Sequence, residues 1–216
     1  SSNDSFSNSA AGLTFNLVHY QQVNYNEYGS GVTDRNRLIA TSDGHMDNVH
    51  ALRYQYGADV VILIYDNSPG LCGVAAGIGV NSSNAFATTR DDCAIGNYTF
   101  AHEIGHLAGA RHDTDPNDEP YAYGHGFRYD PGYWRTVMAV YDDDVNRIPY
   151  WSNPGKTYGG VTMGTTSWRD NARVWDVRAA TMAGFDGDLT PPPPPPPRLR
   201  PGVRSHHDRP HPQEEG

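Results

Sequence analysis

Three histidines and one glutamate stand close together near the middle of the chain. His102 and His106 are four residues apart, so on a helix they would share a face and both imidazoles could reach one metal ion. Glu103 lies beside them and could hold a water molecule on that ion. Gly109 would let the chain turn sharply out of the helix, and His112 then returns as a third ligand. Three protein ligands leave the fourth position of a zinc ion open, which is typical of a catalytic site rather than a structural one.

A helix with solvated histidines is the alternative interpretation of this segment. Three histidines, one glutamate and one glycine at fixed offsets are rare by chance in a chain of this composition, so we favour the metal site. Three further histidines, His45, His50 and His125, are interpreted as core or surface residues rather than ligands.

The segment at 102–112, HEIGHLAGARH, resembles the metzincin pattern of zinc peptidases, H-E-x-x-H-x-x-G-x-x-H. A Met-turn follows this pattern downstream, and residues 135–139 (RTVMA) are similar to it. The resemblance implies that Met138 lies under the zinc as a hydrophobic floor, whereas the alternative is an ordinary core methionine. Some metzincins place a zinc-binding tyrosine two residues after that methionine. Here the position is Val140 and Tyr141 follows, which puts a tyrosine ligand in doubt.

Further segments narrow the resemblance within the metzincins. The aspartate directly after the third histidine, here Asp113, is similar to the pattern of the reprolysin branch. Animal members of that branch usually carry more than the two cysteines of this chain. The chain resembles the bacterial peptidyl-Asp metalloendopeptidases in four segments, at residues 43–53, 121–126, 147–154 and 170–173. The resemblance covers about residues 13–185 and implies an α/β (α+β) fold. It would be a metzincin catalytic domain with a twisted, mostly parallel sheet, an active-site helix, and a C-terminal subdomain that contains the Met-turn.

This resemblance implies a zinc-dependent endopeptidase that cleaves proteins or peptides on the amino side of acidic residues. One catalytic Zn²⁺ would polarise the scissile carbonyl and lower the pKa of its bound water toward about 7. Glu103 would take the proton of that water and later pass it to the leaving amine. We expect the strand at 84–89, with Phe86, to be the sheet edge on which an extended peptide adds.

The pocket for the residue after the cut is expected at residues 147–153, which include Tyr150. A substrate carboxylate that enters such a pocket needs a cationic partner. The chain has one lysine, Lys156, so the partner should be an arginine, whose fork can bind a carboxylate through two hydrogen bonds. Arg147 is the first candidate and Arg173 the second, although Arg147 could instead be a surface residue that answers nearby acidic groups.

The elements that would position these residues follow from patterns of apolar residues. Strands are predicted at 13–20, 59–65 and 86–89, and helices at 43–56, 98–110 and 170–183. Asp43 and Thr99 could cap the first two helices, and Gly57 would end the first. Residues 59–65 are apolar on both faces, which predicts a central strand of a covered sheet.

Composition divides the chain into three parts. Residues 1–12 are small and polar and predict a flexible N-terminal segment. The catalytic domain is expected at 13–186, and a proline-rich linker with a disordered tail at 187–216. Because the chain begins at Ser1 without Met or a signal-like stretch, we interpret it as a processed or truncated form.

Cysteine usage and charge bear on compartment and partners. Cys72 and Cys93 give an even count in a chain rich in Tyr, Asn, Ser and Gly, which favours a disulfide and a secreted protein; two buried thiols are the alternative. A net charge of −9 without a basic stripe argues against nucleic acid. The longest apolar run, 60–65, is far shorter than the roughly 20 residues of a membrane span, so we expect no membrane span. We also expect the protein to be a monomer.

Three other interpretations of the chain stay open. The acidic loops at 113–119 and 142–144 could hold Ca²⁺, although solvated turns are favoured because neither has an EF-hand spacing. A broad-specificity reprolysin-like protease without acidic preference is the main alternative function. A binding module with a structural zinc is a weaker one, because such a site has no use for the unliganded base Glu103.

Overall fold

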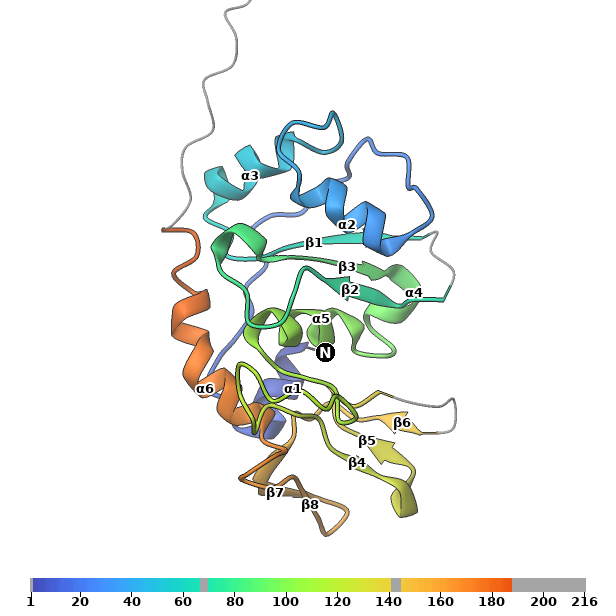
Figure 1. Ribbon diagram of the computed structural model, residues 1–216, viewed down its shortest axis with the longest axis vertical. Coiled ribbons are helices and arrows are strands. Elements are labelled where there is room, and N and C mark those ends of the chain that lie inside the picture. The colour runs from blue at the N-terminus through green and yellow to red at the C-terminus, as the bar shows by residue number, and fades with distance from the viewer. Residues whose placement is uncertain (1, 67–69, 141–144, 188–216) are drawn as a thin grey trace, which may run out of the picture.

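A small mixed sheet forms the upper half of the molecule in Figure 1. The computed structural model describes residues 2–66, 70–140 and 145–187. Its sheet has the order β1-β3-β2, with β1 at Val61–Tyr65, β2 at Gly73–Ala75 and β3 at Phe86–Arg90. β1 and β3 are parallel, whereas β2 and β3 are antiparallel.

The order of these strands corrects two expectations. The sheet is mixed rather than mostly parallel, because the short connection from β2 to β3 allows only an antiparallel return. β3 is the central strand, and β1, which we expected to be central, lies at an edge of the described sheet with Ile64 48% exposed. Apolar residues on both faces predict burial, but they do not predict which neighbours a strand will find.

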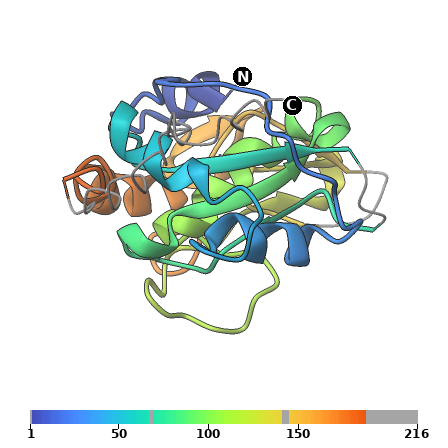
Figure 2. The same cartoon turned by 90° about the horizontal axis from the view of Figure 1, so that it is seen from above.

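Helices cover both faces of the sheet. α2 (Gly31–Ile39) and α3 (Asn48–Tyr56) lie on one face, and α5 (Thr99–Ala108) lies on the other (Figures 1 and 2). α3 begins at Asn48 rather than at Asp43, because the Asp43 and Asp47 carboxylates accept backbone N–H groups of the turn before it. Its end at Gly57, in the left-handed conformation, confirms the predicted stop.

The lower half of the molecule is built from loops and short strands. Its elements are β4 (Arg128–Tyr129), β5 (Trp134–Arg135), β6 (Asn146–Arg147), β7 (Asn153–Tyr158), β8 (Val161–Met163) and α6 (Asn171–Met182). The short helix α4 (Asp91–Ala94) follows β3 directly and lies beside the sheet of the upper half (Figure 1). Two short 3₁₀ helices lie at Ser82–Asn84 and Asp130–Gly132. The predicted last helix is confirmed as α6, and Asp170 caps it by accepting the N–H of Arg173.

The N-terminal residues are not the flexible segment that we expected at 1–12. Residues Ser2–Ser9 form helix α1, and Phe6 is fully buried. Its ring stacks on Trp151 at 5.5 Å and meets Trp175 edge-on at 5.1 Å. Polar composition concealed this role, because a single aromatic residue supplies the anchor and its partners lie far along the chain.

The predicted strand at 13–20 is also wrong, since these residues form no strand. Alternation alone cannot make a strand without a neighbour to complete the ladder, and Leu17 is 83% exposed here. The expected linker and tail beyond residue 187, the acidic loop at 142–144 and Tyr141 lie outside the described residues. No helix among those that are described is long and apolar enough to cross a membrane.

Candidate metal centre

Helix α5 carries His102 and His106 and ends at Ala108, and the chain reverses direction at Gly109. Gly109 caps it with a φ of 115°, and its N–H donates to the carbonyls of Gly105 and His106. A Cβ at Gly109 would stand 2.9 Å from the Tyr121 ring, so this position needs glycine for space as well as for backbone angle. The chain then returns toward α5 and presents His112.

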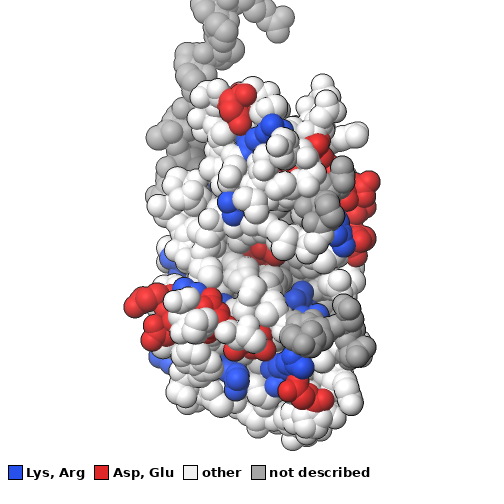
Figure 3. Space-filling view, turned by 45° about the vertical axis from the view of Figure 1, so that its right-hand side comes forward, with Lys and Arg blue, Asp and Glu red and all other residues white. Residues whose placement is uncertain are grey.

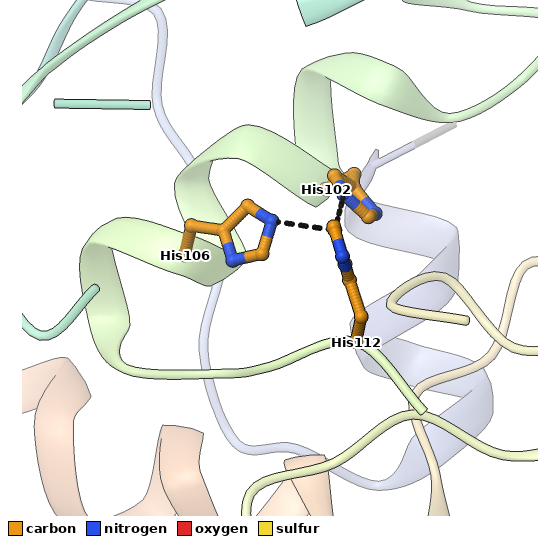
Figure 4. Close-up of side chains that lie close together, drawn as sticks. All are labelled: His102, His106 and His112. Carbon is orange, nitrogen blue, oxygen red and sulfur yellow. Dashed lines mark hydrogen bonds between the residues drawn. The ribbon is translucent and has the colours of Figure 1, made fainter. Parts of the chain in front are cut away.

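The three imidazoles point toward one another (Figure 4). The Nε2 atom of His112 lies 3.0 Å from that of His102 and 2.9 Å from that of His106. His102 donates its Nδ1–H to the carbonyl of Val137 at 2.8 Å, and His106 donates its Nδ1–H to the carbonyl of Ala110 at 2.9 Å. Both Nε2 atoms therefore carry lone pairs, because a neutral imidazole has one N–H.

Such convergent lone pairs fit a cation at their centre. Nitrogen ligands at 2.0–2.1 Å from a tetrahedral zinc lie about 3.3 Å from one another, close to the spacing found here. Burial lowers the pKa of all three histidines, that of His106 to about 3 and that of His102 well below its usual value. Their neutral form, which binds metals, is thus favoured at ordinary pH. Within the described ranges they are the one group of at least three potential ligands that converge.

Glu103 is buried beside this group, and β2 crosses directly over it. A Cβ at Gly73 would stand 2.6 Å from the Glu103 Oε1 atom, so glycine is needed for the close approach. Burial raises the pKa of Glu103 to about 8, opposed by a hydrogen bond from the N–H of Ala75 and by the charges of Arg147 and Arg35. A metal ion on the histidines would act in the same direction as those opposing groups.

A floor of apolar side chains supports the helix from below. Met138 and Trp151 are fully buried, and both touch α5 at Gly105, where a Cβ would stand 2.6 Å from the Met138 sulfur and 2.8 Å from the Trp151 ring. The N–H of Val137, next to Met138, donates to the carbonyl of Tyr150. We did not single out Gly105 or Trp151 from the sequence. A glycine inside a helix, which costs about 1 kcal/mol, was the available signal.

A cleft of about 480 Å³ opens over the histidines and Glu103. It lies in the hollow that crosses the middle of the face in Figure 3, where described acidic and basic side chains are interspersed. Arg147 lines the cleft and donates to the carbonyls of Asn97 at 2.6 Å and Ala139 at 3.2 Å. Burial, and then the charge of Arg135, lowers the pKa of Arg147 to about 9. Its Nε–H is buried without a partner in the described part of the chain.

Other expected substrate residues lie elsewhere. Phe86 is 1% exposed in the core on the α3 side of the sheet, and its strand β3 is flanked on both sides, so β2 replaces it as the sheet edge at the cleft. Tyr150 packs against Tyr158 rather than lining the cleft. Arg173 lies over the Tyr123 ring at 4.0 Å. Strand order and side-chain direction, which local patterns do not specify, account for these differences.

The predicted disulfide is confirmed. Cys72 and Cys93 are bonded and join the residue before β2 to α4. The Cys72 carbonyl accepts the N–H of Arg90 at 2.7 Å, and Cys72 itself lines the cleft. The bond therefore anchors the end of the strand that passes over Glu103.

Residues of the acidic loop at 113–119 have protein partners. Asp113 accepts the N–H of Val140 at 2.9 Å, and Asp115 pairs with Arg111 at 2.5 Å and accepts from Asn117. These contacts account for two carboxylates without a cation, and Ca²⁺ stays an untested prediction. His50 and His125 contact the carbonyls of Ala40 and Asn117, respectively.

The chain is similar to known proteins in sequence and in fold. Residues 1–113 match the family model described as "Metallo-peptidase family M12B Reprolysin-like". The chain is 49% identical over 190 residues to a peptidyl-Asp metalloendopeptidase of Stenotrophomonas maltophilia (strain K279a), covering 85% of this chain and 45% of that protein. A protein of the same name from Pseudomonas fragi is 37% identical over 187 residues, covering 85% and 99%. The chain thus spans less than half the length of the Stenotrophomonas relative.

A solved structure supports the fold alone. One chain of a structure described as "Structure of a chaperone-substrate complex" superposes with a TM-score of 0.65 at 22% identity. The match covers 85% of the present chain and 30% of the other.

Proposed function

The chain belongs to the reprolysin-like M12B metallopeptidase family, and from this premise we propose that it is a secreted zinc endopeptidase that prefers Asp or Glu immediately after the scissile bond. The observation that carries the activity is the set of three histidines whose Nε2 atoms converge, with a buried glutamate beside them. Two of these histidines, His102 and His106, are also held by hydrogen bonds from Nδ1–H to backbone carbonyls. A structural zinc site in a binding module would have no use for that glutamate.

Bound zinc would supply a Lewis acid for the scissile carbonyl and activate a water molecule. Glu103, whose carboxylate accepts the N–H of Ala75, would take the proton of that water and later pass it to the leaving amine. Burial of Glu103 favours its protonated form, which suits the transfer of a proton from Glu103 to the leaving amine. The Val137 and Ala110 carbonyls keep His102 and His106 in the tautomer that offers Nε2 to the metal.

The substrate would add to β2 as an extended strand. On either side of β2, the Cys72 carbonyl accepts the N–H of Arg90, and the N–H of Ala76 donates to the carbonyl of Phe86. By the alternation of an antiparallel ladder, Gly73 and Ala75 then direct their backbone groups away from β3. The N–H of Ala75 is bonded to Glu103 and its carbonyl to Arg35, which leaves the backbone of Gly73 for the peptide.

Residues 135–139 would serve as the Met-turn of the family. The supporting observations are the full burial of Met138, its contact with α5 at Gly105, and the bond from His102 to the neighbouring carbonyl of Val137. Secretion is supported by the disulfide, which persists in oxidising compartments.

The acidic preference rests on Arg147 and on the name peptidyl-Asp metalloendopeptidase that the relatives carry. Arg147 lines the cleft, and its buried Nε–H has no partner among the described residues. A carboxylate is the partner that a desolvated guanidinium favours most. A broad-specificity protease of the same family is the second candidate, because Arg147 already donates to two carbonyls and could be purely structural.

Matched peptides that carry Asp, Asn or Leu after the cut separate these candidates. We expect Arg147→Ala to lower the Asp-over-Leu ratio of kcat/KM at least about 10-fold, because a hydrogen bond to a charged group contributes about 1.5–3 kcal/mol. Arg37→Ala, on the outer surface of α2, is the matched control and should leave the ratio unchanged. An unchanged ratio in Arg147→Ala would exclude it as the selector, and no preference in the unmodified enzyme would favour the broad-specificity protease.

A further inference from the structure

We propose that Thr99 is a second specificity-determining residue: its hydroxyl and the first turn of α5 act with Arg147 to hold the carboxylate of the substrate residue after the scissile bond. This inference rests on the proposed function, because it assigns the recognition of an acidic side chain within the same cleft. Thr99 was considered from the sequence only as a helix cap, and it does not act as one here, since the cap position is Tyr98.

The hydroxyl of Thr99 is buried and has no hydrogen-bond partner among the described residues. Thr99 is 3% exposed, yet it is one of the residues that line the cleft. Leaving a buried hydroxyl unpaired is unfavourable, so most such groups in proteins have a partner. A residue at the wall of a cleft whose buried hydroxyl is unpaired among the described residues is therefore a candidate for contact with whatever enters that cleft.

The position of Thr99 relative to the catalytic base suits such a role. It lies one helical turn before Glu103 on α5, and residues four apart share a helix face. A Cβ at Gly73 would stand 2.8 Å from the Thr99 methyl carbon and 2.6 Å from the Glu103 Oε1 atom. Thr99 and Glu103 thus lie side by side beneath β2, the strand to which the peptide would add.

The first turn of α5 offers further donors. The helix has ten residues, and Tyr98 at its N-cap adopts the left-handed conformation without a side-chain capping bond. The first N–H that meets an acceptor within the helix is that of His102, which donates to the carbonyl of Tyr98. No acceptor is recorded in the described part of the chain for the three N–H groups before it, and no acidic residue stands in this turn. Among the described residues, the first turn of α5 therefore has no acidic side chain of its own to balance the positive end of the helix dipole.

Arg147 is tied to the same turn. Its Nη1 donates to the carbonyl of Asn97 at 2.6 Å, two residues before Thr99, and both residues line the cleft. The buried Nε–H of Arg147 has no partner within the described structure. A carboxylate has about four acceptor positions on its two oxygens, so it can accept from the guanidinium and from the Thr99 hydroxyl together. A neutral side chain would gain less than a carboxylate from the positive charge of Arg147 and from the positive end of the α5 dipole.

The test uses the zinc-loaded enzyme and three variants of one residue. Thr99→Val keeps the methyl group and shape but lacks the hydroxyl, Thr99→Ser keeps the hydroxyl, and Thr99→Ala replaces Thr99→Val if that protein does not fold. Thr88→Val, which removes a buried hydroxyl on β3 that bonds to the Gly31 carbonyl, is the matched control. Peptides differ only in Asp, Asn or Leu after the cut, and kcat and KM are measured separately.

We expect Thr99→Val to lower kcat/KM for the Asp peptide about 10-fold or more, with less than about 3-fold change for the Leu peptide. Thr99→Ser should retain the Asp preference, and Thr88→Val should not change it. Calorimetry gives a readout apart from turnover: a product peptide that begins with Asp should bind more weakly to Thr99→Val, whereas one that begins with Leu should bind equally. The free variant should be no less stable than the unmodified protein, because the lost hydroxyl has no partner to leave behind.

The possible outcomes distinguish a failure of this inference from a failure of the proposed function. If the unmodified enzyme shows no preference for Asp, the proposed specificity fails and the role of Thr99 fails with it. If the enzyme prefers Asp and Thr99→Val keeps the full preference, Thr99 is excluded while the proposed function stands. An equal loss on Asp and Leu peptides would show a general structural role for Thr99 and would overturn the inference as well.

Discussion

Glu103 is not a member of the group of converging potential ligands found among the described residues, and its buried carboxylate accepts the N–H of Ala75. Glu103→Gln keeps the size of the side chain and removes the base. We expect kcat to fall by about 10²–10⁴ while one zinc per chain remains bound, because general-base catalysis contributes a factor of that order. Steady-state kinetics and metal analysis on the same preparation check both halves. A variant with near-normal turnover would contradict the mechanism, and one that loses zinc would place Glu103 among the groups that hold the metal.

Asp115 supplies a prediction on pH dependence. Burial raises its pKa, but hydrogen bonds from Asn117 and Arg111 outweigh this and lower the value from 3.8 to about 2. A depressed folded-state pKa stabilises the protein above the unfolded pKa, and that stability is lost as the pH falls through the folded value. Asp115→Asn should therefore lower the free energy of unfolding by at most about 1 kcal/mol at pH 6, because the pair is partly solvated.

The difference between Asp115→Asn and the unmodified protein should shrink as the pH falls from about 4 toward 2. Urea unfolding of both proteins at matched pH values measures this difference, and effects common to both, such as loss of metal in acid, cancel. A difference that stays constant down to pH 2 would show that the charge of Asp115 is not its cause.

Among the elements, α1 has a role that extends to the metal centre. Ser5 accepts the indole N–H of Trp151 at 2.9 Å, Ser9 accepts its backbone N–H at 2.8 Å, and Phe6 stacks on its ring. Trp151 in turn packs against α5 at Gly105, between Glu103 and His106. The helix therefore supports the metal-binding helix from behind, through one tryptophan.

Truncation of Phe6 tests this support. Phe6→Ala should lower the free energy of unfolding by about 3–5 kcal/mol, because it leaves a cavity among Trp151, Trp175 and Phe15. Phe6→Leu should cost less, since it refills part of the space. Denaturant titration of both variants gives the comparison. A loss below about 1 kcal/mol in Phe6→Ala would show that α1 is only loosely attached.

For the molecule as a whole, the Cys72–Cys93 bond ties the strand above the catalytic cleft to the segment that leads into α5. Its sequence separation of 21 residues predicts a stabilisation of about 3 kcal/mol from the lost freedom of the unfolded chain. The denatured, unreduced protein should contain no reactive thiol, and reduction should lower its melting temperature by several degrees. Double replacement by Ser is the control for the reductant, and an unchanged melting temperature in both would show that the bond contributes little.

Local spacing carried the chemistry of the metal centre. His102, Glu103 and His106 lie on one helix, where the contacts between neighbours follow from the helical period alone, so the segment predicts its own geometry. Gly109 and His112 are close enough in sequence for the same argument. The ends of α3 and α6 were also predictable in part, because Gly57 and Asp170 act on the backbone of their own helix.

Long-range pairing determined the rest. Which strand lies at the cleft depends on hydrogen bonds between segments distant in sequence, and for that reason β2 rather than β3 forms the edge. The attachment of α1 depends on two tryptophans more than 140 residues away, and the unpaired hydroxyl of Thr99 can be recognised only when every neighbour is in place. A residue type states what a side chain can donate, accept or bury. Whether it finds a partner is a property of the packed interior, where each contact competes with all the others for the same space.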